Sequence, residues 1–141
     1  MREKYRVVLD TNVLLSAYQS KKGASHEVLR RLAEDEFEIA LSVPLVLEYE
    51  EILNAKLDPN IFSSSYVEAI VNYICKIGKF AEIFYLWRPL LSDPEDDHIL
   101  ELAISAKCSH IITYNKKDFK GAEQFGIQVI DAAEFLNSLK N

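Results

Sequence analysis

The chain has 141 residues, 49% of them hydrophobic, with four glycines and four prolines, a composition typical of one domain with a buried core rather than of a disordered chain. A net charge of −6 excludes a surface that binds nucleic acid over its whole area, but leaves room for a local basic track. No apolar run approaches the roughly 20 residues that cross a bilayer, and no signal peptide opens the chain, so we expect a cytoplasmic protein without membrane contact.

Short stretches rich in β-branched and aromatic residues alternate with longer stretches of helical periodicity. We expect strands, in chain order, at Tyr5–Leu9, Phe37–Leu41, Glu82–Leu86, His110–Thr113 and Ile127–Ile130. We expect one helix to begin near Val13, and further helices at Ser25–Glu34, Pro44–Leu57, Ser65–Ile77, Pro94–Lys107 and Ala132–Leu139. Asp131 and Glu134 have the spacing of a capping box, which marks the start of the last helix.

Strands separated by helices of this length predict a mostly parallel sheet with helices on both faces. We therefore expect an α/β fold with three layers, α/β/α, formed as a single domain by residues 1–141.

Acidic residues recur where strands end or where helices begin. Asp10 directly follows the first strand, and Glu48 lies roughly one to two turns into the helix after the second. The run Asp93–Asp97 opens the helix before the fourth strand, and Asp118 follows that strand. If the strands are parallel and adjacent, all four positions lie at one edge of the sheet, where open α/β sheets bind ligands.

Four carboxylates at one edge would repel one another, because two unit charges ~5 Å apart cost about 3 kcal/mol at an effective dielectric near 20. Such a cluster needs protons or a divalent cation. A ligand set made only of oxygen selects Mg²⁺ or Mn²⁺ over zinc. These ions activate water and stabilise charge on a phosphodiester, so the pattern indicates phosphodiester hydrolysis.

The acidic motifs resemble those of the PIN-domain nuclease family. Four segments carry the resemblance, in the family's order and roughly its spacing: Val8–Leu14, Leu41–Glu48, Asp93–Ala103 and Ile112–Phe119. The resemblance implies a PIN-like fold and an endoribonuclease that depends on Mg²⁺ or Mn²⁺. Within the family the chain is most similar to compact prokaryotic toxins of toxin–antitoxin pairs, which implies an RNA substrate, a small antitoxin protein as partner and a homodimer.

The resemblance also implies roles for individual residues. Asp10 and Glu48 would be catalytic metal ligands. Glu50 and Glu51 compete with Glu48 for the second position, and the spacing from Ser42 favours Glu48.

The third acidic position is open between two neighbours. Counting back from Ile99–Leu100 favours Asp96, and counting back from Thr113 favours Asp97, so we take Asp96 first as the metal ligand and keep both as catalytic candidates.

The fourth position has two candidates in the family, which carries an acid at one or both of them. The first is Asn115 in this chain, so Asp118 carries the charge as a catalytic metal ligand. Residues expected to support these ligands or to contact substrate are Thr11, Asn12, Thr113, Asn115, Lys116 and Lys117.

Each acid also has a structural explanation when taken alone, as a helix cap or as part of a solvated helix face. The alternative function is therefore a non-catalytic PIN module that binds RNA or a protein. A structure-specific DNA nuclease is less favoured, since the chain lacks room for insertions that clamp DNA.

Other residues suggest contacts without a motif. The aromatic residues that we consider for stacking on unpaired bases are Tyr18, Tyr49, Tyr114 and Trp87. Apolar residues between Ile61 and Leu91 are the first place to expect an interface, and His98 is the histidine placed nearest to the acids, beside Asp97.

Overall fold

The computed structural model describes residues 4–83 and 96–140. A five-stranded sheet with the order β3-β2-β1-β4-β5 forms its centre, and every neighbouring pair of strands is parallel. The strands are β1 (Arg6–Leu9), β2 (Glu38–Leu41), β3 (Lys79–Phe80), β4 (His110–Ile112) and β5 (Gln128–Ile130). This sheet confirms the predicted α/β class.

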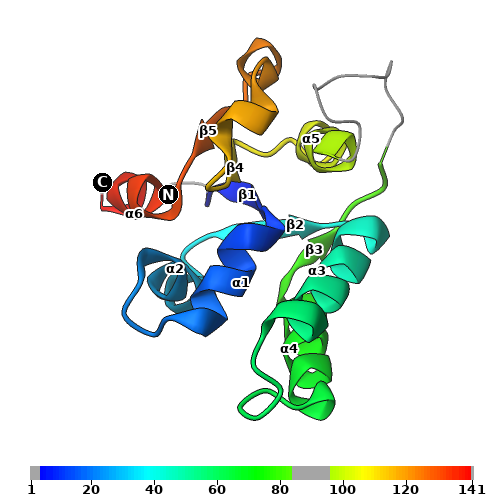
Figure 1. The fold of residues 1–141 in the computed structure, drawn as a ribbon. Coiled ribbons are helices and arrows are strands. Elements are labelled where there is room, and N and C mark those ends of the chain that lie inside the picture. Colours follow the sequence, from blue (N-terminus) through cyan, green and yellow to red (C-terminus); the bar gives the residue numbers. More distant parts are fainter. Residues whose placement is uncertain (1–3, 84–95, 141) are drawn as a thin grey trace.

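Helices surround the sheet to give the three layers that the sequence predicts. They are α1 (Thr11–Gln19), α2 (Ala24–Ala33), α3 (Val43–Lys56), α4 (Ser64–Ile77), α5 (Asp97–Ser105) and α6 (Ala132–Leu139), and two short 3-10 helices, η2 (Lys116–Phe119) and η3 (Ala122–Phe125), join β4 to β5. Helix α5 lies on one side of the sheet and α1, α2 and α6 lie on the other, while α3 and α4 run side by side near β3 (Figure 1). In the part of the chain that the structure describes, no helix is long and apolar enough to cross a membrane.

The predicted position of the third strand is wrong. We expected it at Glu82–Leu86, but the structure places it at Lys79–Phe80, directly after α4, and Glu82 and Ile83 lie outside any strand. The remaining residues, 84–86, lie outside the described ranges. Gly78 explains the early start, since a Cβ atom there would lie 2.3 Å from Cδ1 of Leu41 on β2, so glycine lets the chain approach β2 closely.

The fifth long helix is shorter than predicted in its described part. We expected Pro94–Lys107 and find α5 at Asp97–Ser105, with Lys107 at a φ of 56°, a left-handed conformation that cannot continue a helix. Residues 93–95 of the acidic run lie outside the described ranges.

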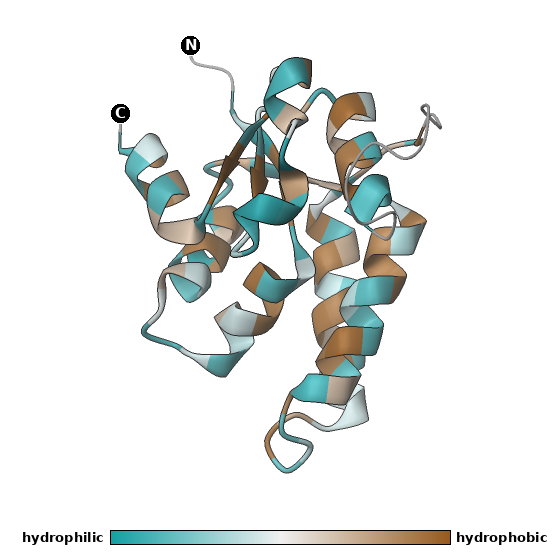
Figure 2. Ribbon diagram, turned by 45° about the horizontal axis from the view of Figure 1, so that its top comes forward, coloured by the Kyte–Doolittle hydropathy of each residue, from teal (hydrophilic) through white to brown (hydrophobic). Residues whose placement is uncertain are grey.

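The core lies between the sheet and the helices. Strands β1 and β4 are apolar along most of their length and are buried, as expected for parallel strands covered on both faces. Figure 2 shows the same contrast, with hydrophobic central strands and helices that carry both hydrophobic and hydrophilic residues. On α4 the buried residues recur every three or four positions, as Val67, Ile70, Val71 and Ile74.

Side-chain caps fix where several helices begin. The hydroxyl of Ser42 accepts a hydrogen bond from the backbone N–H of Leu45 (3.3 Å), which starts α3 directly after β2. The predicted capping box is confirmed, because Asp131 accepts from the N–H of Glu134 and Glu134 accepts from the N–H of Asp131, each at 2.9 Å.

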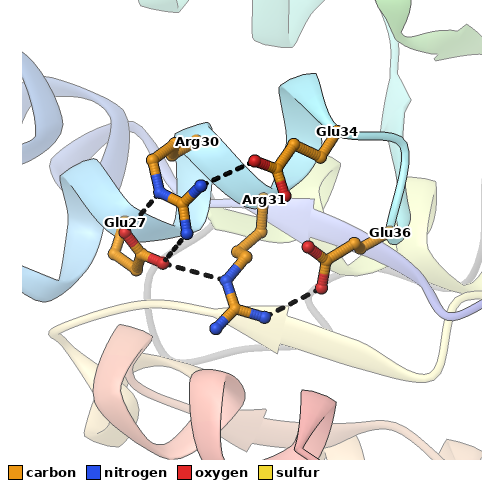
Figure 3. Close-up of polar contacts among 5 residues, drawn as sticks. All are labelled: Glu27, Arg30, Arg31, Glu34 and Glu36. Carbon is orange, nitrogen blue, oxygen red and sulfur yellow. Dashed lines mark hydrogen bonds and ion pairs between the residues drawn. The ribbon is translucent and has the colours of Figure 1, made fainter.

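An ion-pair network fastens the end of α2 to the segment that enters β2 (Figure 3). Glu27 accepts hydrogen bonds from both Arg30 and Arg31, Arg30 reaches Glu34, and Arg31 reaches Glu36. Hydrogen bonds from Arg30 and then Arg31 lower the pKa of Glu27 to about 2.

Candidate functional site

Asp10 lies where the strand order reverses, because β1 has β2 on one side and β4 on the other. Its backbone N–H continues the β1–β4 ladder to the carbonyl of Ile112 (2.9 Å), and its side chain caps α1 by accepting from the N–H of Thr11 (2.8 Å). The second carboxylate oxygen accepts from the hydroxyl of Thr113 (2.7 Å) and from the amide of Asn12 (3.4 Å). Asp10 is 8% exposed, so its carboxylate is held by short contacts in an almost buried position at the carboxyl end of the sheet.

The loop after β4 is joined to this corner by further hydrogen bonds. Thr113 is fully buried, and its hydroxyl accepts from the N–H of Asn115 (3.0 Å). The side-chain oxygen of Asn12 accepts from the N–H of Tyr114 (3.3 Å). Three of the residues predicted to support the acids therefore hydrogen-bond to Asp10, namely Thr11, Asn12 and Thr113, and Asn115 contacts the last of them through its backbone.

Glu48 is connected to Asp10 through one residue. The hydroxyl of Thr11 donates a hydrogen bond to Oε2 of Glu48, while the backbone N–H of Thr11 donates to Asp10. Nε2 of His98 contacts the other oxygen, Oε1, at 3.4 Å. Glu50 and Glu51, the competing acids on α3, are exposed, so the geometry favours Glu48.

A buried tyrosine holds the helix that carries Glu48. The hydroxyl of Tyr49 donates a 2.6 Å hydrogen bond to the carbonyl of Leu9, the residue before Asp10. Tyr49 is 1% exposed, and this bond ties α3 to the end of β1. The sequence offered no signal for this contact, since the two residues meet only in the folded chain.

The pKa values of Asp10 and Glu48 move in opposite directions. Burial raises the pKa of Asp10, the hydrogen bonds from Thr113 and Thr11 offset part of the rise, and the negative charges of Glu48 and Asp118 add to it. Burial also acts to raise the pKa of Glu48, but the hydrogen bonds from His98 and Thr11 outweigh it and lower the pKa below its usual range. Asp118, whose charge is the smallest of these causes, is half-buried in η2.

The start of α5 reaches the site through His98, which the sequence singled out only by its place beside Asp97. Asp97 is the first residue of α5 and is fully buried, and Asp96 before it is half-buried. Both residues make polar interactions, so Asp96 and Asp97 both remain candidates for the third ligand.

The two lysines after β4 take different positions. Nζ of Lys116 forms an ion pair with Glu134 and lies 3.9 Å from Asp131, so it is held against the start of α6. Lys117 is exposed. Both side chains are exposed, and Lys116 is the one that the fold ties to α6.

The ligand chemistry of the site suits a hard cation, although the described side chains do not form a full cage. Within residues 4–83 and 96–140, no three or more His, Cys, Asp or Glu side chains are grouped so that they could hold a metal ion. Mg²⁺ commonly binds through one or two carboxylates and completes its shell with waters and substrate phosphates. Asp10 and Glu48, joined through Thr11, fit that mode of binding.

Residues 6–117 match the family model described as PIN domain. The matched range contains Asp10, Glu48 and the start of α5, and it ends directly before Asp118. No curated protein matches the chain.

Proposed function

We propose that this chain, which belongs to the PIN-domain family of nucleases, is a metal-dependent endoribonuclease that hydrolyses phosphodiester bonds of RNA. The observation that carries the proposal is the link from Asp10 through Thr11 to Glu48 at the carboxyl end of the sheet, with the charge of Asp118 acting on Asp10. A buried carboxylate that feels the negative charges of two others is unfavourable unless a cation or protons compensate it.

Asp10 and Glu48 would hold Mg²⁺ or Mn²⁺, with Asp118 and one of Asp96 and Asp97 as further ligands. The charge of Asp118 acts on Asp10. A bound divalent cation supplies an activated water and neutralises charge that develops on the phosphodiester. The chain's own residues orient the carboxylates that would bind the cation. Thr113 fixes one oxygen of Asp10.

The oxygens of Glu48 are held from two sides, by Thr11 on Oε2 and by His98 on Oε1. Both contacts favour the ionised form of Glu48, as its lowered pKa shows. Glu48 is therefore a charged ligand near neutral pH, which is the form that binds a cation.

We also propose that residues 1–141 form one PIN domain. The matched range stops at residue 117, but β5 pairs with β4 beyond it, and α6 contacts α2.

The biological role that we propose is that of the toxin in a toxin–antitoxin pair, acting in the cytoplasm as a homodimer that a small antitoxin protein inhibits. The support is the similarity of the acidic motifs to compact prokaryotic toxins, together with exposed apolar side chains in the region where we expected an interface. These are Ile61, Tyr66, Tyr73 and Phe80, whereas residues 84–91 of that region lie outside the described ranges. Light scattering of the purified protein tests the dimer.

A second candidate function is a non-catalytic PIN module that binds RNA or a protein. Two observations favour it, namely the lack of a three-residue metal cluster in the described ranges and the amide of Asn115 at one of the two positions where the family carries an acid at one or both. A binding module predicts RNA affinity that survives removal of Asp10.

The deciding experiment measures cleavage of a mixed RNA pool with Mn²⁺, with Mg²⁺ and with a chelator. It compares the wild type with Asp10→Asn and Glu48→Gln, and uses Glu50→Gln as the matched control because Glu50 is an exposed acid on the same helix. We expect cleavage by the wild type and by Glu50→Gln in metal only. Calorimetric titration of Mn²⁺ gives a second readout. Cleavage by Asp10→Asn at the wild-type rate would overturn the proposal.

A further inference from the structure

Tyr114 stands apart from the other aromatic residues considered for base stacking. Tyr49 is almost completely buried, Trp87 lies outside the described ranges, and Tyr18 is half-buried with its ring against Phe62 at a centroid distance of 6.3 Å. Tyr114 is 45% exposed. It is therefore the candidate whose ring is open to a ligand.

The exposed ring is anchored at both ends. Its hydroxyl hydrogen-bonds to the hydroxyl of Ser25 on α2, which is 1% exposed, and its backbone N–H donates to Asn12 on α1 at 3.3 Å. Most exposed side chains lose rotamer freedom when they bind a ligand. Tyr114 has already lost this freedom in folding, so its ring is a fixed surface.

The same region of hydrogen bonds places the backbone of Tyr114 next to the residues that hold the proposed catalytic carboxylate. Thr113, the preceding residue, donates to Asp10 at 2.7 Å, and Asn12 contacts both Asp10 and Tyr114. Adjacent Cα atoms are about 3.8 Å apart. The Cα atom that carries the Tyr114 side chain is therefore this close to the Cα atom of Thr113, whose hydroxyl holds Asp10.

Stacking is a source of substrate affinity at this edge that does not depend on its lysines, of which Lys116 is paired and Lys117 is exposed. The protein has a net charge of −6, and Lys116, two residues from Tyr114, is paired with Glu134. Stacking on an aromatic ring needs no positive charge and tolerates any base. A base within a duplex has both faces covered by its neighbours, so only an unpaired base can use the ring.

We propose that Tyr114 stacks on an unpaired nucleobase next to the scissile phosphodiester, which makes the site select single-stranded RNA. This inference rests on the proposed nuclease function and names a substrate-binding residue for the same site. Ser25 acts through Tyr114 by holding its hydroxyl.

The test measures binding of a fluorescein-labelled single-stranded RNA by anisotropy, in a chelator so that no cleavage occurs. Tyr114→Ala is expected to weaken binding about 5- to 150-fold, as stacking by one base predicts, and Tyr114→Phe to weaken it less than about threefold. Phe125→Ala is the matched control, since Phe125 is an aromatic residue of similar exposure (42%) on η3, outside the region where we expected an interface. Thermal melts confirm that each variant is folded.

Two further probes separate stacking from a general loss of structure. An RNA that lacks bases is expected to bind the wild type and Tyr114→Ala equally, because the partner of the ring is gone. Duplex RNA is expected to bind more weakly than single-stranded RNA and to show no effect of Tyr114→Ala. Equal loss on duplex and single strand, or unchanged binding by folded Tyr114→Ala, would overturn the inference.

Cleavage assays distinguish this failure from failure of the proposed function. If the wild type cleaves RNA in metal and Tyr114→Ala has the same kcat and KM, the nuclease stands and the stacking site does not exist. If the wild type neither binds nor cleaves RNA, both are wrong.

Discussion

The hydroxyl of Thr113 donates a 2.7 Å hydrogen bond to Oδ2 of Asp10, and this bond joins the ends of the adjacent strands β4 and β1. Thr113 is fully buried and Asp10 is 8% exposed, so water competes little for either group. A hydrogen bond to a charged group is stronger than one between neutral groups, and its loss leaves Oδ2 of Asp10 with only the longer bond from Asn12 (3.4 Å). Thr113 therefore sets the position of Asp10.

Thr113→Val is expected to lower the rate of RNA cleavage by about 10- to 150-fold, because a hydrogen bond to a charged group contributes about 1.5–3 kcal/mol. The N–H of Asn115 loses its acceptor in the same variant. Thr113→Ser keeps the hydroxyl and is expected to retain most of the activity. Single-turnover kinetics on RNA measure the effect, and a folded Thr113→Val protein with wild-type rates would contradict it.

The position of Asp10 could be predicted from sequence because it follows from topology alone. A carboxylate after a buried apolar strand lies at the carboxyl end of that strand, and parallel pairing with β4 brings Thr113 beside it. Topology alone could not identify Glu48, because three acids, Glu48, Glu50 and Glu51, occupy one short stretch of helix. The contact from Thr11 that distinguishes Glu48 exists only in the folded chain.

The positions of β3 and Lys116 could not be predicted for related reasons. The aromatic and β-branched run after Glu82 has the stronger strand propensity, but Gly78 lets the chain pair with β2 earlier. Lys116 flanks the acidic site in sequence, which suggested a phosphate contact. The fold instead brings Lys116 to Glu134, which lies 18 residues further along the chain (134 − 116), and the two form an ion pair.

Histidine 110 is expected to make stability depend on pH. Burial lowers the pKa of His110 below its ordinary value of 6.5. The unfolded chain therefore takes up a proton at higher pH than the folded chain. This contribution to stability is complete above pH 6.5 and is lost as the pH falls below that value towards the lowered pKa of the folded state.

Urea unfolding at a series of pH values checks this expectation with His110→Phe. The ring of His110 lies 5.2 Å from Tyr5 and 5.7 Å from Phe135, so phenylalanine suits the surroundings. We expect the variant to lose less stability than the wild type as the pH falls below 6.5. Parallel pH profiles for the two proteins would show that His110 is not the group responsible.

Glu27→Gln is expected to remove a small, salt-sensitive contribution to stability. Hydrogen bonds from Arg30 and Arg31 lower the pKa of Glu27 to about 2 from 4.5, so its contribution is complete above pH 4.5 and is lost as the pH falls towards 2. Because the side chains of the network are 25% to 53% exposed to solvent, its effect should shrink between about 0.1 M and about 1 M NaCl.

Thermal melts at neutral pH compare Glu27→Gln with Glu34→Gln. Glu34 accepts from Arg30 alone, whereas Glu27 accepts from both arginines, so the first variant should lower the melting temperature more than the second. Equal shifts, or shifts that do not respond to salt, would mean that the ion pairs of Figure 3 contribute no electrostatic stability.

Gly78→Ala is expected to destabilise the fold by about 1–3 kcal/mol, the usual cost of overpacking a core. The backbone is not the reason, since the φ of Gly78 is −80°, which alanine adopts freely. The reason is Leu41, which is fully buried and whose Cδ1 and Cγ atoms would lie 2.3 Å and 2.7 Å from the new Cβ. Denaturant unfolding measures the cost, and Gly23→Ala is the control because its Cβ would meet nothing nearer than 3.5 Å.

The double variant Leu41→Ala/Gly78→Ala identifies the clash as the cause. Leu41→Ala alone should destabilise by about 2–5 kcal/mol through the cavity it leaves. If Leu41 is the obstacle, Gly78→Ala should cost much less in that background than in the wild type, so the two changes are not additive. Hydrogen exchange at the N–H of Ala81, which donates to the carbonyl of Leu41 at 2.9 Å, localises the effect to the β2–β3 pair. Fully additive costs, with unchanged exchange at Ala81, would instead place the damage of Gly78→Ala away from Leu41.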